Sequence, residues 1–138
     1  MDNNLLTKKL ELFKEYYDKI NRLIVEETDV LSQDELKYHT LERLFQLLVD
    51  CSVDINIHLL KEKTGKVPDD LQSTFIELGN AKMLDEKFAK KMAPVVGLRN
   101  RIVHRYDTLN NKDFINLLKS NLADFDQYFN IVRKLLLG

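Results

Sequence analysis

The chain has 138 residues, of which 44% are hydrophobic and 31% are charged, and its formal net charge is −1. This balance is typical of one globular domain spanning residues 1–138 and excludes a disordered chain. Four glycines and two prolines are too few for the many turns of an all-β fold, and no apolar run is long enough to span a membrane. The composition therefore favours an all-α protein that is not embedded in a membrane.

The cysteine content and the N-terminus point to the cytoplasm. The N-terminal residues lack the pattern of a signal peptide, and the single cysteine, Cys51, cannot form an internal disulfide. Because Cys51 lies in the apolar run LFQLLVDCSV, we expect a buried packing thiol rather than a nucleophile. No His or Cys pair has the spacing of zinc ligands, so we expect neither a metal site nor a cofactor.

Apolar residues at helical spacing predict the first two elements. The first amphipathic helix is expected over about residues 3–28, with the stripe Leu6, Leu10, Phe13, Tyr17, Ile20 and Ile24. Ser32 and Glu35 have the spacing of a capping box, so a second helix is expected to begin there. Its apolar positions continue to about Lys63, and Gly65 suits a left-handed stop.

Two further helices are expected before the C-terminal third of the chain. Pro68 fits the first turn of a short third helix, and Gly79 fits its end. A fourth helix is expected from about Asp85 to Tyr106, with a kink or break at Pro94.

The last element follows a turn in the stretch DTLNN. Apolar residues recur at helical spacing from Phe114 to Leu136, which predicts a final helix. The sequence shows no strand pattern, repeat or linker. We therefore predict an antiparallel bundle of about five helices.

One decamer, GLRNRIVHRY at residues 97–106, concentrates positive charge. Six Lys or Arg and no acidic residue lie between Lys87 and Tyr106, although the whole chain is almost neutral. Such a run is either an ordinary solvated helix face or a surface that holds an anion. On a helical wheel, Arg99 and Tyr106 fall within the apolar arc of Leu98, Ile102 and Val103. An arginine there needs a partner or a ligand, which favours a cleft or a subunit interface.

The histidine of the decamer points elsewhere on an ideal helix. His104 lies about 140° from Arg99 at 100° per residue, and close to Asn100, which could orient its ring. Arg99 and His104 can therefore meet one ligand only if the helix ends near His104 or a second subunit contributes. For this reason, and because the apolar arc is a poor solvent surface, we expect a homodimer through the fourth helix. In VDINIHLL, Asp54 and His58 stand four residues apart and could form a simple intrahelical pair.

Arg99, His104 and Tyr106 have the R-x4-H-x-Y spacing that resembles the HepT-like branch of the HEPN-domain proteins. The lead-in GLRN, the stretch VDINIHLL and the approach DDLQSTFIELGNAKMLDEKFAKKM are also similar to that family. The resemblance extends over nearly the whole chain and implies a dimeric helical bundle. It further implies the toxin of a toxin–antitoxin pair, a metal-independent endoribonuclease whose partner is an MNT-type nucleotidyltransferase antitoxin.

The resemblance also implies roles for particular residues. His104 would transfer protons, Arg99 would neutralise charge on the phosphate, and Asn100 would orient His104 or a phosphate oxygen. Arg101 and Arg105 would attract the RNA backbone without reading its sequence. The remaining assignments are Tyr106, whose hydroxyl would receive AMP from the antitoxin, and Asp54, an auxiliary polar group near the site.

Two other functions use the same decamer. The chain could be a docking partner and substrate of the nucleotidyltransferase with little nuclease activity, or a nucleotide-binding bundle with Arg99 as its anion site. Tyr106 could likewise be a structural residue with its hydroxyl at the rim of a cleft. Expression of the chain alone, and then with Arg99→Ala or His104→Ala, would separate these functions, because growth arrest that both substitutions relieve indicates the toxin.

Overall fold

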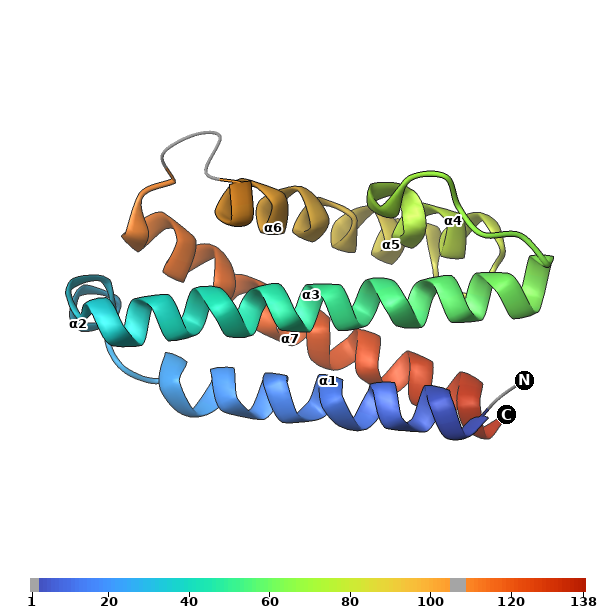
Figure 1. Ribbon diagram of the computed structural model, residues 1–138, viewed down its shortest axis with the longest axis horizontal. Helices are drawn as coiled ribbons and strands as arrows, with labels where there is room; N and C mark the ends of the chain where they lie inside the picture. Colours follow the sequence, from blue (N-terminus) through green and yellow to red (C-terminus); the bar gives the residue numbers. More distant parts are fainter. Residues whose placement is uncertain (1–2, 105–108) are drawn as a thin grey trace.

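The computed structural model describes residues 3–104 and 109–138, and over these residues it is helical without strands (Figure 1). In this part of the chain there are seven α-helices and one 3-10 helix: α1 (Asn3–Ile24), α2 (Thr28–Gln33), α3 (Glu35–Thr64), η1 (Leu71–Ser73), α4 (Thr74–Asn80), α5 (Glu86–Met92), α6 (Pro94–His104) and α7 (Asn111–Leu137). The all-α prediction is confirmed. None of the described helices is both long enough and apolar enough to cross a membrane.

The long helix α3 is the centre of the bundle. Helix α1 packs antiparallel on α3 and also contacts α7, whereas α4, α5 and α6 lie along the other side of α3 (Figure 1). Helix α6 runs antiparallel to α3, so its C-terminal end lies toward the N-terminal half of α3. This arrangement places the arginine-rich helix beside the middle of the longest helix.

An aromatic cluster fills the core between α1, α3 and α7. Phe13, Phe45, Phe114, Phe125 and Tyr128 are fully buried, and neighbouring rings meet with centroids 5.5 to 6.3 Å apart. Tilted and edge-on contacts of this kind add to the hydrophobic stabilisation of the buried rings. The apolar positions predicted from helical spacing thus form one core.

A buried polar network crosses this core. The Tyr128 hydroxyl bonds to the Asn56 Oδ1 and to the Ser52 carbonyl, and Asn56 Nδ2 donates to Thr74 Oγ1 at 3.2 Å. Burial raises the pKa of Tyr128 well above its ordinary value, so this phenol remains a neutral donor. Since a buried polar group without a partner is destabilising, the network specifies how α7, α3 and α4 pack together.

Two boundaries and one short helix differ from what the sequence leads us to expect. The first helix ends at Ile24, and the chain then forms the short helix α2, whose single buried residue is Leu31. Ser32 lies inside α2 and donates to the Asp29 carbonyl, so the predicted capping box is wrong. The N-cap of α3 is Asp34, whose side chain accepts from the backbone N–H of Lys37 at 3.1 Å.

The ends of the middle helices also correct and confirm particular predictions. Gly65 has a φ of 73° at the C-cap of α3, as expected. Pro68 is not helical, because the next helical turn begins at Leu71, behind the N-cap Asp70. The predicted break at Pro94 is confirmed: α5 ends at Met92, and Pro94 is the first residue of α6.

Gly79 has a different role from the predicted helix stop. It is buried inside α4, which continues to Asn80. A Cβ at this position would lie 2.9 Å from the Cβ of Ala89, so α4 and α5 approach too closely for a side chain here. Gly97 in α6 is different, because a Cβ there would meet nothing within 4 Å.

The two helical glycines are therefore expected to respond oppositely to alanine. Gly79→Ala should lower the free energy of unfolding by about 1–3 kcal/mol through overpacking against Ala89. Gly97→Ala should raise it by about 0.5–1 kcal/mol, since alanine is the better helix former and nothing obstructs it. Urea denaturation followed by circular dichroism measures both, and destabilisation of equal size in the two variants would contradict the packing argument.

Candidate functional site

Arg99 joins α6 to α3 through a two-point ion pair. Its Nε lies 2.8 Å from Asp50 Oδ1 and its Nη2 lies 3.1 Å from Asp50 Oδ2, and 22% of the Arg99 side chain is exposed. On the same helix Val95, Val96 and Leu98 are buried in the core. The apolar side of α6 thus packs on the bundle, and the Arg99 guanidinium binds Asp50 of α3 at the edge of this contact.

Asp50 is the partner that the position of Arg99 requires, and it is not among the site residues expected from the sequence. A partly buried guanidinium is stabilised by a carboxylate that it can meet with two parallel hydrogen bonds. The prediction that Arg99 needs a partner is confirmed, but the partner lies in the same chain. Of the apolar arc of α6, Leu98 is buried within the chain, Ile102 is half-buried and Val103 is exposed, so the homodimer expected through this helix stays a prediction.

Asn100 and His104 occupy different surroundings. The Asn100 Oδ1 accepts a hydrogen bond from Arg99 Nη1 at 3.4 Å, so the amide borders the guanidinium. His104 is exposed and is the last residue of α6, which is continuous from Pro94 onward. An orienting contact between Asn100 and His104 stays a prediction.

The remaining residues of the decamer divide into two groups. Arg101 is exposed on α6, beside the half-buried Ile102. Arg105 and Tyr106 lie outside the described residues, so their predicted roles stay predictions.

Arg99 and Asn100 form part of one wall of a hollow of about 820 Å³ between α6, α3 and η1. The hollow is strongly acidic: Asp50 and Asp54 come from α3, and Asp69 and Asp70 from the segment before η1. Asp54 is exposed and lies 3.7 Å from Lys9, so it pairs with α1 rather than with His58. The structure therefore brings the auxiliary candidate Asp54 to the same hollow as Arg99, together with acids that the sequence analysis did not select.

The single thiol is placed as expected. Cys51 is buried and its Sγ donates to the Lys9 carbonyl at 3.1 Å. Burial is the main cause that raises its pKa to about 11, so the reactive thiolate is scarce at neutral pH. Within the described residues, no three His, Cys, Asp or Glu side chains are grouped so that they could hold a metal ion.

Comparison with known proteins decides the family. The model of the family described as "Ribonuclease HepT-like" matches residues 13–132. This chain belongs to the HepT-like ribonuclease family. The tRNA nuclease HepT of Aphanizomenon flos-aquae is 34% identical over 135 residues, covering 96% of this chain and 90% of that protein. The mRNA nuclease HepT of Shewanella oneidensis is 21% identical over 131 residues, covering 95% of this chain and 98% of that protein.

Solved structures agree with the HepT-like fold. The tri-AMPylated HEPN toxin of S. oneidensis, determined in complex with an MNT antitoxin, superposes with a TM-score of 0.87 at 20% identity. The match covers 97% of this chain and 98% of that one. A cytosolic protein of unknown function from Bacillus subtilis gives a TM-score of 0.82 at 19% identity over 99% of this chain and 91% of that one. The resemblance inferred from the R-x4-H-x-Y spacing is confirmed.

The Arg99–Asp50 pair predicts an energetic coupling that Asp54 lacks. In a double-mutant cycle of unfolding free energies, Asp50→Ala and Arg99→Ala should couple by about 1 kcal/mol, because each removes the two-point contact that the structure shows for the other. The matched cycle with Asp54→Ala and Arg99→Ala should give a coupling near zero, since Asp54 pairs with Lys9. Equal coupling in the two cycles would show that the Arg99–Asp50 contact is not formed in solution.

Proposed function

We propose that this chain is the toxin of a HEPN/MNT toxin–antitoxin pair and cleaves RNA in the cytoplasm, with Arg99, Asn100 and His104 as its reacting groups. The observation that carries the proposal is the placement of Arg99 in this HepT-like chain. Its guanidinium is held by Asp50 at the rim of a hollow, five residues before an exposed histidine at the end of the same helix.

The reaction that fits these groups is metal-independent transesterification. The RNA 2′-hydroxyl attacks the adjacent phosphorus, so a bond from O2′ to phosphorus forms and the bond from phosphorus to O5′ breaks. One proton leaves the 2′-hydroxyl and one is delivered to O5′, and His104 takes part in this transfer. Being exposed at the end of α6, His104 is accessible to a polymeric substrate.

Arg99 remains able to bind phosphate while it is paired. Asp50 occupies the edge formed by Nε and Nη2, and a guanidinium has five N–H donors. One Nη1 donor points to the Asn100 Oδ1, so the other Nη1 donor and the second Nη2 donor are the ones that neutralise charge developing on the phosphate oxygens. Because the carboxylate cancels much of the arginine's charge, we assign long-range attraction of RNA to Arg101 and Arg105.

Assembly as a homodimer through α6 completes the site in this proposal. Arg99 faces α3 while His104 is exposed at the helix end, so the two groups of one chain are oriented differently. A second copy related by a two-fold axis would bring its own His104 near the first, which is how isologous interfaces double a site. Asp54, in the same hollow as Arg99, keeps its auxiliary assignment.

The proposed antitoxin is an MNT-type nucleotidyltransferase that transfers AMP to the Tyr106 hydroxyl. The S. oneidensis toxin, whose structure includes an MNT antitoxin, is tri-AMPylated. In our chain, phosphate attached two residues past His104 would be able to occupy the free donors of Arg99 as a tethered mimic of the RNA backbone. Charge and bulk together would then exclude the substrate without unfolding the bundle.

Substitution of the reacting groups tests the nuclease proposal. Arg99→Ala should reduce RNA cleavage by the purified chain by about 10²–10³-fold, through loss of a charged donor to the phosphate. His104→Ala should reduce it by about 10²–10⁴-fold through loss of proton transfer. Arg99→Lys should not restore the rate, because an ammonium cannot keep the planar two-point contact with Asp50 and still present further fixed donors to phosphate.

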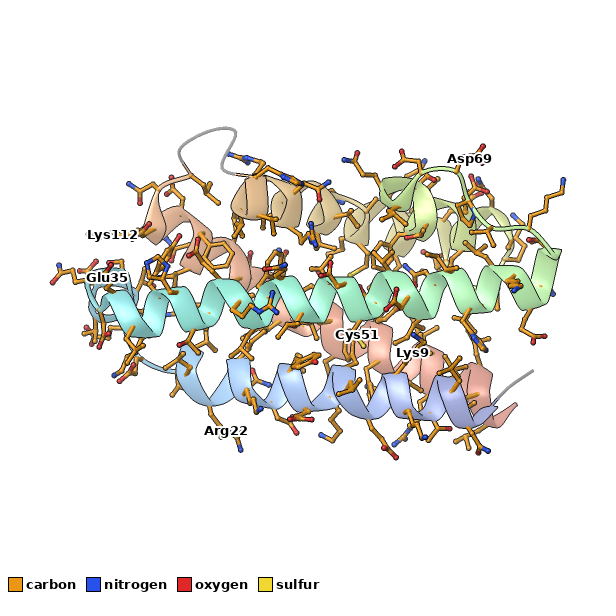
Figure 2. All side chains as sticks on the ribbon, in the orientation of Figure 1. Lys9, Arg22, Glu35, Cys51, Asp69 and Lys112 are labelled. Carbon is orange, nitrogen blue, oxygen red and sulfur yellow. The ribbon has the colours of Figure 1, made fainter. Side chains whose placement is uncertain are left out.

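The control for this test is Arg22→Ala, which removes an exposed arginine of α1 on the opposite side of the bundle (Figure 2). Growth arrest on expression should be relieved by the two site substitutions and retained with Arg22→Ala. If arrest persists in all three variants, the toxicity does not depend on Arg99 and His104, and their assignment as reacting groups is wrong.

The modification proposal predicts a separate phenotype for Tyr106. Tyr106→Phe should fold, retain at least part of the nuclease activity and escape inactivation by the cognate nucleotidyltransferase with ATP. Intact-mass analysis should detect AMP on the unsubstituted chain and none on Tyr106→Phe, with Tyr16→Phe as the matched control that is labelled normally. Equal labelling of the Tyr106→Phe variant would exclude Tyr106 as the acceptor.

A further inference from the structure

Three hollows lie along the contact between α6 and α3, and their charged linings differ. The acidic hollow, defined by Asp50, Asp54, Asp69 and Asp70, sets four carboxylates against the guanidinium of Arg99. Toward the C-terminal end of α6 lie two adjoining hollows, of about 470 and 300 Å³, that share His39, Glu42 and Ile102. We call these two the His39 groove. Its charged lining consists of Glu35, Glu42, Arg43, Arg101 and His39.

The carboxylates of the His39 groove are less available than those of the acidic hollow. Glu42 is 8% exposed, and its Oε1 lies 2.8 Å from His39 Nδ1, so the imidazole covers it. Glu35 is exposed at the outer end of the groove, with its Oε1 3.8 Å from His39 Nε2 (Figure 2). Arg43 and Arg101 are both exposed. A polyanion beside α6 therefore meets two guanidiniums in the groove, where one carboxylate is buried and the other lies at the rim.

The His39 groove also reaches the C-terminal end of α6, which carries His104. Its smaller part is lined by Ile102 and Val103, the two residues that precede His104, and by Arg43 and Gln46 from α3. Val103 is 36% exposed and gives this part an apolar floor. His39 and Arg43 stand one helical turn apart on α3, about 6 Å, so they can contact neighbouring points of an extended chain.

We propose that the RNA strand runs from the Arg99–His104 motif into the His39 groove, with Arg43 and His39 contacting its phosphates and Gln46 its sugar–phosphate backbone. This inference rests on the proposed function and adds where the substrate lies. Beyond the rim formed by Arg99, the acidic hollow is the excluded continuation of the strand, because a phosphate there would face the exposed carboxylates of Asp54 and Asp69. Since Arg43, His39 and Gln46 contact the backbone alone, they strengthen binding without selecting a sequence.

Binding of a non-cleavable RNA tests the path separately from catalysis. The probe is a short fluorescent 2′-O-methyl oligoribonucleotide, and its anisotropy is measured with the full chain over a range of salt concentrations. Arg43→Ala should raise Kd about fivefold near 0.1 M salt and lower the slope of log K against log salt by about 0.7, the loss of one phosphate contact on a single strand. His39→Gln should weaken binding in the same direction.

Two matched variants make the result specific. Arg22→Ala removes the same charge from exposed α1 and should leave Kd unchanged, and Asp69→Asn should leave Kd unchanged or lower it. Figure 2 shows Asp69 and Glu35 at opposite ends of the molecule, so these positions report on different hollows. Circular dichroism confirms that each exposed substitution leaves the helices intact.

The outcomes separate this inference from the nuclease proposal. Unchanged binding by both Arg43→Ala and His39→Gln, equal weakening by Arg22→Ala, or no binding of the probe by the unsubstituted chain overturns the RNA path. If Arg43→Ala and His39→Gln weaken binding while Arg99→Ala and His104→Ala leave cleavage unchanged, the path stands and the assignment of the reacting groups fails.

Discussion

The attachment of α6 to α3 through Arg99 and Asp50 governs the geometry of the candidate site. An isolated helix of 11 residues is marginal in water, so α6 depends on its contacts with the bundle. Val95, Val96 and Leu98 bury one side of the helix, while the ion pair fixes its rotation about its own axis. With that rotation set, Asn100 borders the guanidinium and the helix end carries His104 to the surface. The same carboxylate removes much of the charge of Arg99, so in this site the arginine serves position and close contact more than long-range attraction.

Helical spacing was sufficient to predict the fold because the core is simple. The stripe from Leu6 to Ile24 in α1 and the aromatic positions of α7 face one shared interior, and their periodicity is visible in the sequence. Helix α2 was not predicted, because a helix of six residues with one buried leucine shows no repeat of apolar positions in the sequence. Gly79 was interpreted as a helix stop because a sequence does not show why a glycine is present. A glycine that allows two helices to approach closely looks the same as one that adopts a left-handed turn.

The site was predictable only where its residues are neighbours in sequence. The spacing of Arg99 and His104 identified the motif and the family. Asp50 could not be selected among 22 acidic residues, because its partner is 49 positions away and the pairing depends on the packing of α6 on α3. The acidic hollow and the His39 groove arise in the same way, from segments that meet only after folding. The stretch LLVDCSVD does contain an indication of these contacts. Asp50 and Asp54 stand four residues apart in an otherwise largely apolar run, and they mark the edge of α3 whose carboxylates pair with basic side chains.

The position of Cys51 has a consequence for how such a protein withstands oxidative stress. Its sulfur is covered by α1, bonded to a backbone carbonyl, and held as a thiol. Sulfenylation and mixed-disulfide formation need an exposed thiolate. In the folded chain the Cys51 thiol is therefore protected from peroxide and from small disulfides. This thiol becomes reactive only when α1 separates from α3. Oxidation of Cys51 thus marks a chain in which α1 has separated from α3. It leaves the groups on the α6 side of α3 chemically unchanged.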